Sequence, residues 1–323
     1  MSDAGQTRDR GMVGRAPWIA GLIFALAAAV CFASIPSLAR LAYDGGSDPL
    51  TVAFLRSLMG SLALVMMILI FRRPILLPRR AWPLTFLATL SWFVTNVSYL
   101  AAVFYLPVGL ACLLLYCFPF VAAALLPLSG AGGLGARGFG AGLLALVGLG
   151  LAVATVYGEL DPQGLLFALL AAAGASITVL VSRRLAGLHD VFSITVYVNL
   201  GGALLLAGAL VPLGGFSLPY AFTGWAGLVG ASAFYAVAIV VQFAAMGLSC
   251  PGRLGPRLGP RLGLVSYAEP LLTIAIAAVV LGELLAPVQF LGALLVTAAL
   301  VLLAWQPQAD PQRQGKVATT SRD

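Results

Sequence analysis

Apolar runs of about twenty residues recur along the whole chain, and this feature restricts its fold more than any other. At ~1.5 Å per residue, twenty residues form a helix ~30 Å long, which matches the hydrocarbon core of a bilayer. Within lipid every backbone N–H and C=O group needs a partner from the chain itself, and a helix supplies all of them. The chain is 61% hydrophobic and only 9% charged, whereas a soluble domain has roughly 25% charged residues. We therefore expect an all-α, polytopic membrane protein.

The apolar runs divide into ten predicted transmembrane helices separated by short loops. These helices cover approximately residues 18–42, 49–71, 81–105, 107–128, 137–156, 163–185, 190–212, 220–248, 261–282 and 287–305. Arginines and lysines concentrate in alternate loops and in both tails, while the opposite loops carry acidic residues such as Asp44, Glu159 and Glu283. Because basic residues mark the cytoplasmic side, we expect the tails at 1–17 and 306–323 to be cytoplasmic. The net charge of +7 then reflects membrane orientation and does not indicate nucleic-acid binding.

The two halves of the chain resemble each other. Trp82 and Trp225 lie 143 positions apart, and a Tyr-x-x-Pro motif occurs at both Tyr116–Pro119 and Tyr267–Pro270. Each half holds five predicted spans, and an odd number makes the second half enter the membrane from the opposite side. The predicted repeats cover residues 18–156 and 163–305. We expect two inverted five-helix repeats, with a solute bound near the midplane beside the interrupted fourth and ninth spans.

Three sequence features carry a family resemblance. They are Leu55-Arg56, the helix around Pro119, and Ser266-Tyr-Ala-Glu-Pro270 followed by Leu281-Gly-Glu283. With them, residues 18–305 resemble the drug/metabolite transporter superfamily in its EamA branch, which includes aromatic amino-acid exporters of the YddG type. One departure is that the first half has Leu126-Pro127-Leu128 where a second Leu-Gly-Glu is expected.

The resemblance implies a secondary transporter that works by alternating access in the bacterial inner membrane. The substrate it implies is an amino acid, aromatic or otherwise neutral, that is exported from the cell. The alternative is a nucleotide-like or vitamin-like metabolite carried by the same fold. The expected partners are the small solute and the lipid bilayer, without nucleic acid. A monomer is expected, or a homodimer that packs through the Gly138-x-x-x-Gly142 motif.

Two charged residues fall inside predicted spans, where a charge costs ~2.5–3.5 kcal/mol on insertion scales. Arg56 lies about seven residues into the second span and Glu269 about seven into the ninth, from opposite sides. Each is then ~10 Å deep, and a direct ion pair is not expected. Arg56 is a candidate anchor for a substrate carboxylate, or it extends outward to cap helix carbonyls. Glu269 is a candidate for proton coupling or amino-group binding, or it bonds to backbone that Pro270 frees.

Aromatic and amide residues recur at matching positions in the two halves. In the third span they follow i, i+4, i+7 spacing on one helix face, and in the eighth span equivalents appear 143 positions later. Candidate substrate-binding residues are Trp92, Asn96, Tyr99, Tyr116, Tyr235, Gln242 and Tyr267, with Asn199, Ser34 and Ser176 as secondary candidates. They either line a cavity for an apolar or aromatic solute or simply pack between helices. Pro119 and Pro270, which the repeat pairs, are the predicted hinges.

Catalytic and cofactor chemistry has little support in the sequence. His189 is the only histidine, and the four cysteines form no CxxC pair, so we expect neither a metal site nor a catalytic triad. The GxGxxG run at Gly130–Gly135 follows no predicted strand, which argues against a dinucleotide site. The chain has no P-loop for direct use of ATP. We expect neither an enzyme nor a cofactor.

Overall fold

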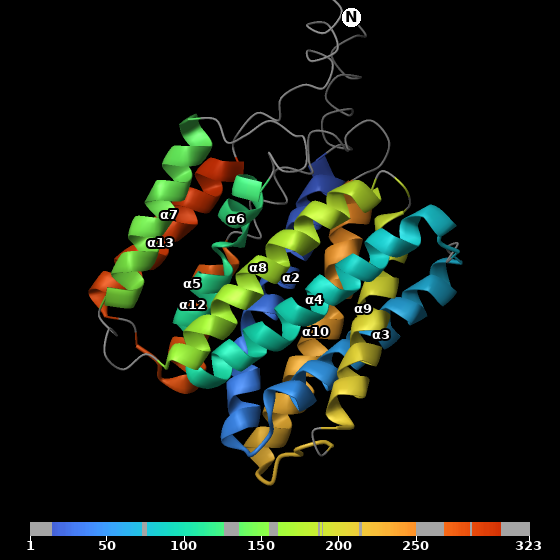
Figure 1. Ribbon diagram of the computed structural model, residues 1–323, viewed down its shortest axis with the longest axis horizontal. Helices are drawn as coiled ribbons and strands as arrows, with labels where there is room; N and C mark the ends of the chain where they lie inside the picture. The colour runs from blue at the N-terminus through green and yellow to red at the C-terminus, as the bar shows by residue number, and fades with distance from the viewer. Residues whose placement is uncertain are drawn as a thin grey trace, which may run out of the picture.

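The computed structural model describes residues 15–72, 76–125, 136–154, 161–186, 188, 190–212, 215–249, 268–284 and 286–304. Within these ranges the regular secondary structure is entirely helical (Figure 1). Some predictions fall elsewhere in the chain. Tyr267, His189, the GxGxxG run and the Leu126-Pro127-Leu128 segment lie outside the described residues.

The helices of the first half are α2 (Arg15–Asp44), α3 (Pro49–Phe71), the 3-10 turn η1 (Arg79–Ala81), α4 (Trp82–Tyr105), α5 (Val108–Leu115), α6 (Phe118–Leu125) and α7 (Ala136–Ala154). The helices of the second half are α8 (Pro162–Ala186), α9 (Val191–Leu210), α10 (Phe222–Ser249), α12 (Glu269–Leu281) and α13 (Pro287–Ala304). Among the described residues, seven segments are long and apolar enough to cross a membrane. The structure also contains three shorter apolar helices, Gly138–Val153, Glu269–Leu281 and Pro287–Leu303.

Large apolar side chains cover much of the helix surface. Ile70, Phe139, Leu204 and Phe222 are each at least two-thirds exposed. Such a surface is a liability in water, where exposed apolar patches promote association, but it suits contact with lipid tails. Apolar residues outside and polar residues between helices are the distribution expected of a multi-pass membrane protein.

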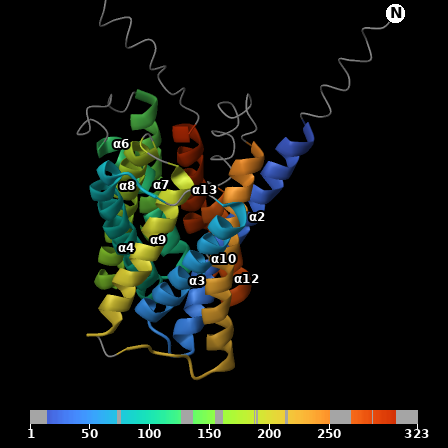
Figure 2. The same ribbon diagram turned by 90° about the vertical axis from the view of Figure 1, so that its right-hand side faces the viewer.

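The helix pairings repeat when the two halves are exchanged. Helix α2 packs along α10, and its counterpart α8 packs along α4 (Figures 1 and 2). In the same way, contact of α3 with α10 corresponds to contact of α9 with α4. In the pairs α3–α9 and α7–α13, the two helices are each other's counterparts, so exchanging the halves leaves these pairs unchanged. This pattern of pairing is the one that a pseudo-twofold relation between two like-folded halves would produce.

Glycines allow the closest of these approaches. A Cβ at Gly148 of α7 would lie 2.7 Å from the carbonyl oxygen of Gly292 in α13, and a Cβ at Gly292 would clash with the Gly148 carbonyl in return. Between α2 and α10, a Cβ at Gly227 would lie 2.5 Å from the Leu38 carbonyl oxygen. Small residues of this kind let membrane helices meet backbone to backbone. Within the predicted GxxxG motif, by contrast, a Cβ at Gly142 would make only ordinary contact with Phe120, at 3.9 Å.

The fourth predicted span consists of two helices with a break at Tyr116–Cys117. Helix α5 ends at Leu115 and α6 begins at Phe118, so Pro119 lies in the first turn of a new helix. In the second half α12 begins at Glu269, with Pro270 in its first turn. A proline has no N–H to donate, and the first turn is where none is needed. Pro36 shows the contrast, because it lies inside the continuous helix α2.

Asp48 caps α3 and helps to join the two halves at one end of the bundle. Its carboxylate accepts hydrogen bonds from the backbone N–H groups of Leu50 at 2.8 Å and Thr51 at 3.0 Å. The Thr51 hydroxyl donates to Asp48 at 2.6 Å and accepts from the Ser217 N–H at 3.0 Å. Burial acts to raise the pKa of Asp48, but the hydrogen bonds outweigh it and leave that pKa below its ordinary value. The connection between α2 and α3 is thus bonded to the one between α9 and α10.

Candidate functional site

Arg56 of α3 is a buried cation at the junction of three helices. Its side chain is only 8% exposed. One terminal nitrogen donates a hydrogen bond to Oδ1 of Asn96 in α4, and the guanidinium carbon lies 4.6 Å from the centre of the Tyr235 ring in α10. Asn96 donates in turn to the Ser57 hydroxyl at 3.0 Å. The guanidinium is therefore held by one amide and one aromatic face.

Tyr235 links this cation to a fourth helix. Its hydroxyl donates to Oδ1 of Asn199 in α9 at 2.7 Å, and the Asn199 amide donates to the Thr195 carbonyl at 3.0 Å. The ring lies against Gly60 of α3, where a Cβ would come within 2.5 Å of a ring carbon. Gly60 is therefore required for Tyr235 to lie this close to Arg56. The result is a continuous polar chain across α4, α3, α10 and α9.

The guanidinium has donor capacity that its neighbours do not use. Arginine carries five N–H donors, and Nε of Arg56 is buried without a hydrogen-bond partner in the described part of the chain. No described carboxylate forms an ion pair with it. A buried charge with an unsatisfied donor is costly unless an acceptor of opposite charge arrives. An anionic group is the ligand that would satisfy this arrangement.

A second polar group surrounds Glu269 at the start of α12. The Tyr116 hydroxyl, just after α5, lies within hydrogen-bonding reach of the Glu269 carboxyl. Cys112 of α5 lies within the same reach of Tyr99 in α4 and Thr273 in α12. Tyr99 is in electrostatic range of both Arg56 and Glu269, so the two charges flank one aromatic residue. The two groups therefore adjoin each other in the interior of the bundle.

The structure brings most, but not all, of the candidate residues together. Arg56, Asn96, Tyr235, Tyr99, Tyr116 and Glu269 belong to the two adjoining groups. Trp92 instead lies against α9, where a Cβ at Gly202 would come within 2.5 Å of its ring, so helix packing accounts for its position. Gln242 is half-buried in α10, seven residues beyond Tyr235. Pro119 follows the break between α5 and α6 near Tyr116, and Pro270 lies in the first turn of α12 next to Glu269.

Sequence reasoning missed Ser57, Cys112 and Thr273 as members of these groups and named Asn199, which accepts from Tyr235, only as a secondary candidate. A signal for Asn199 was present, because it lies 143 positions after Arg56, the same offset that relates Trp92 and Tyr235. The other three are small polar residues in apolar helices, and nothing in their spacing distinguishes them. Among the described residues, no group of three or more His, Cys, Asp or Glu side chains is placed to hold a metal ion.

Comparisons with known proteins agree with this architecture. The family model described as the EamA-like transporter family matches the chain twice, at residues 19–154 and 162–305. No curated protein matches the chain. Twenty-six chains of solved structures match. One of these, titled only "Crystal structure of protein", aligns with a TM-score of 0.56 and 20% identity, over 86% of this chain and 96% of its own. At that identity the likeness shows a shared fold.

Proposed function

This chain belongs to the EamA-like transporter family, and from that premise we propose that it is a secondary transporter that exports amino acids by alternating access. Membership of the family makes it a multi-pass membrane transporter of small metabolites. The observation that carries the finer proposal is the buried guanidinium of Arg56, whose Nε has no partner among the described residues. An amino acid supplies the missing acceptor as its carboxylate.

The two adjoining polar groups suit the two charges of an amino acid. The carboxylate would accept from Arg56, which binds such groups bidentately. The ammonium group would donate to the Glu269 carboxyl, which Tyr116 already contacts. Tyr99 lies in electrostatic range of both charged residues and offers an aromatic surface for the rest of the solute. These residues come from both halves of the chain, as binding between inverted repeats requires.

The proposal includes a route for alternating access. Helix α6 begins anew after the break at Tyr116–Cys117, and α12 begins at Glu269. A broken helix can change the angle between its segments at small cost, since no continuous ladder of backbone hydrogen bonds has to be disrupted. Pro119 and Pro270 would then mark the hinges. Because Tyr116 and Glu269 lie beside them, a hinge movement would reshape the binding site directly.

We further propose ten spans in two inverted repeats, 18–156 and 163–305, in the bacterial inner membrane. Both termini would be cytoplasmic, in accord with the basic loops. On this topology the end of the bundle that carries Asp44 and Glu283 faces outward. Fusing a reporter enzyme after each predicted span would test the count and the orientation. A reporter active outside the cell when fused after span ten would contradict the proposal.

Transport in liposomes tests the function itself. Purified protein would be reconstituted and given labelled neutral amino acids, nucleosides and vitamins, with and without a pH gradient. We expect uptake of neutral amino acids, aromatic ones included, and loss of that uptake in Arg56→Met. Arg183→Met is the matched control, because Arg183 is exposed in the last turn of α8. Uptake of only nucleosides or vitamins would replace the amino acid with the alternative substrate class, and no uptake of any solute would contradict the proposal.

A further inference from the structure

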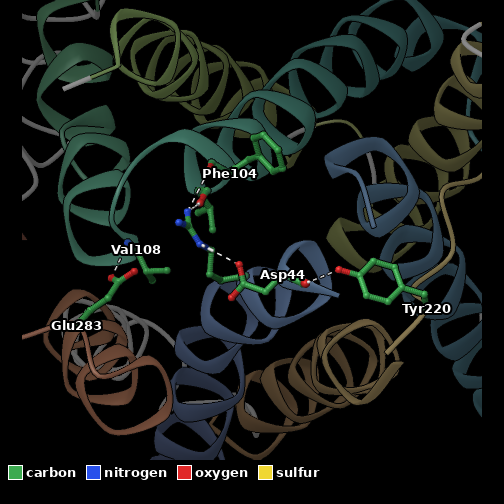
Figure 3. A network of polar contacts seen from close by, with 7 residues as sticks. Asp44, Phe104, Val108, Tyr220 and Glu283 are labelled. Atoms are coloured by element: carbon green, nitrogen blue, oxygen red, sulfur yellow. Dashed lines mark hydrogen bonds and ion pairs between the residues drawn. The ribbon is translucent and has the colours of Figure 1, made fainter. Parts of the chain in front are cut away.

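Arg40, near the end of α2, bonds to the end of α4, where Figure 3 labels Phe104. Its guanidinium donates hydrogen bonds to the backbone carbonyls of Val103 at 2.9 Å and Phe104 at 3.0 Å. The last carbonyls of a helix have no partner within that helix, so a cation there satisfies them and complements the helix dipole. Nε of Arg40 also lies 3.8 Å from the carboxylate of Asp44. Arg40 thus joins the ends of two helices.

Glu283 holds the beginning of α5 from the other side. It follows Gly282, which ends α12 in the left-handed conformation at φ 70°. Oε2 of Glu283 accepts a hydrogen bond from the N–H of Val108, the first residue of α5, at 2.9 Å. The N–H groups of a first turn lack partners in their own helix, and a carboxylate at that end is favoured. This bond connects the second half of the chain to the first.

Arg40 and Glu283 therefore hold one turn from two sides. The turn at Leu106-Pro107 joins α4 to α5, with the Arg40 contacts just before it and the Glu283 contact just after it. The two side chains are also electrostatically coupled. As long as both contacts exist, α2 and α12 remain bound to the α4–α5 turn.

The sequence repeats only one member of this pair in the other half. The residue 143 positions after Arg40 is Arg183, whose side chain is exposed. In the first half no acidic residue occurs between Leu126 and Arg137, the stretch that follows the fourth predicted span as Glu283 follows the ninth. The cation is repeated and the acid is not. A contact whose acidic member occurs in only one of two inverted repeats favours one of the two alternating states.

We propose that Arg40 and Glu283 form a latch on the α4–α5 turn that holds the transporter in the state closed at this end. The inference rests on the proposed alternating access, in which the latch must open once in every cycle. A ligand or contact shifts such an equilibrium only by its differential stabilisation of the two states. Breaking the latch should then raise the fraction of molecules that are open at the Glu283 end, even in the absence of solute.

Native Cys112 is a suitable reporter of opening. It lies one turn beyond Val108 in α5 and is only 1% exposed, so a reagent reaches it from this end only after the helices separate. Cys31, Cys117 and Cys250 would be replaced by serine in the full-length chain. Leu218 is exposed, so labelling of Leu218→Cys would identify the side of sealed vesicles that corresponds to this end. A membrane-impermeant maleimide would then be added on that side. The rate of Cys112 labelling would then measure opening at this end.

We expect Glu283→Ala and Arg40→Met each to raise the labelling rate roughly tenfold, as loss of a hydrogen bond to a charged group implies. Glu283→Gln keeps an acceptor for the Val108 N–H without the buried charge, and should label no faster than the parent. Asp161→Ala is the matched control, because the Asp161 carboxylate accepts from the Gln163 N–H at 2.8 Å, at the start of α8, and joins no second helix among the described residues. Its labelling rate should equal that of the parent.

Unchanged labelling in both Glu283→Ala and Arg40→Met, at parent thermal stability, overturns the latch. An equal rise in Asp161→Ala also overturns it, because any lost carboxylate would then have the same effect. Two variants on opposite sides of the turn keep the test decisive if one of them fails to fold. The measurement needs no solute, so a protein that transports nothing but labels as expected would contradict the proposed function and leave the latch standing.

Discussion

Arg56 and Asn199 occupy equivalent positions in the two halves of the chain, and Tyr235 contacts both of them. The ring of Tyr235 lies 4.6 Å from the guanidinium carbon of Arg56, and its hydroxyl donates to Asn199 at 2.7 Å. A symmetrical scaffold thus carries an unsymmetrical pair, one cation and one neutral amide. A solute with a single anionic group would bind such a pair in one orientation only.

Replacing Arg56 by methionine should separate function from stability. An unpaired buried cation contributes little to folding, and an apolar residue of similar size is often neutral or stabilising by about 1–4 kcal/mol. We therefore expect Arg56→Met to unfold at the parent temperature or above it. Transport of amino acids should fall at least about tenfold, because a charge-assisted hydrogen bond to the solute is lost. Strong destabilisation with transport retained per folded molecule would show that Arg56 only supports the fold.

The hydroxyl of Tyr235 should act on stability through Asn199. Tyr235→Phe keeps the ring over Arg56 and removes the hydrogen bond, at an expected cost of about 1 kcal/mol in unfolding free energy. Asn199→Leu removes the acceptor. Since both changes delete the same bond, the double variant should be less destabilised than the sum of the two single variants. Thermal unfolding in detergent measures the three values, and strict additivity would count against the coupling.

Two glycines of one helix should respond differently to the same substitution. A Cβ at Gly148 would lie 2.7 Å from the Gly292 carbonyl oxygen, whereas a Cβ at Gly150 would meet nothing within 4 Å. Gly148→Ala should therefore destabilise the protein by roughly 1–3 kcal/mol through overpacking of α7 against α13. Gly150→Ala should be neutral or slightly stabilising, because alanine favours the helix. Equal effects of the two substitutions in thermal unfolding would contradict the observed packing.

Asp48 should make folding stability sensitive to acid. Its pKa is lowered in the folded protein, so its contribution to stability is present above the ordinary value of 3.8 and is lost as the pH falls through the folded pKa. Loss of the cap in Asp48→Ala should cost about 1 kcal/mol at pH 7. The parent and the variant should converge in unfolding temperature at the acid end of that range. A constant difference at every pH would contradict the assignment.

Glu283 should give the latch a pH dependence of the opposite sign. Burial raises the pKa of Glu283, and the nearby charge of Asp44 acts in the same direction. The Val108 hydrogen bond and the charge of Arg40 lower this pKa but do not outweigh burial. Since a raised pKa favours the protonated group in the closed state, acid should stabilise closure. Cys112 labelling should slow as the pH on that side falls toward the ordinary value of 4.5. Glu283→Gln, measured in parallel, should lack this component.

The position of the helices along the chain could be predicted because apolar length and capping residues act locally. The second predicted span, 49–71, coincides with α3, which begins at Pro49 immediately after the Asp48 cap. The break at Tyr116–Cys117 could not be distinguished from a bend in this way, since apolar residues continue through it. Hydropathy reports whether a segment suits lipid and carries no information on the continuity of its hydrogen bonds.

The candidate site could be predicted only in part, because its contacts depend on how the helices are rotated against each other. Arg56 and Asn96 were both candidates, but their spacing of forty positions says nothing about a hydrogen bond between α3 and α4. The repeat places Trp92 and Tyr235 at equivalent positions, so it favoured both equally as candidate binding residues. They differ in what the neighbouring helix presents, since Tyr235 reaches Arg56 and Asn199 while Trp92 is accounted for by packing on Gly202.

The mutual contact of Gly148 and Gly292 has a consequence for how such a molecule could move. Each backbone abuts the carbonyl of the other, so exchanging the conformations of the two halves leaves that junction as it was. The nearest side chains are those of Leu295, 2.9 Å from a Cβ at Gly148, and Ala152, 3.2 Å from a Cβ at Gly292. If the chain works by the proposed alternating access, the α7–α13 pair would keep the same contact in both states while other helix pairs rearrange.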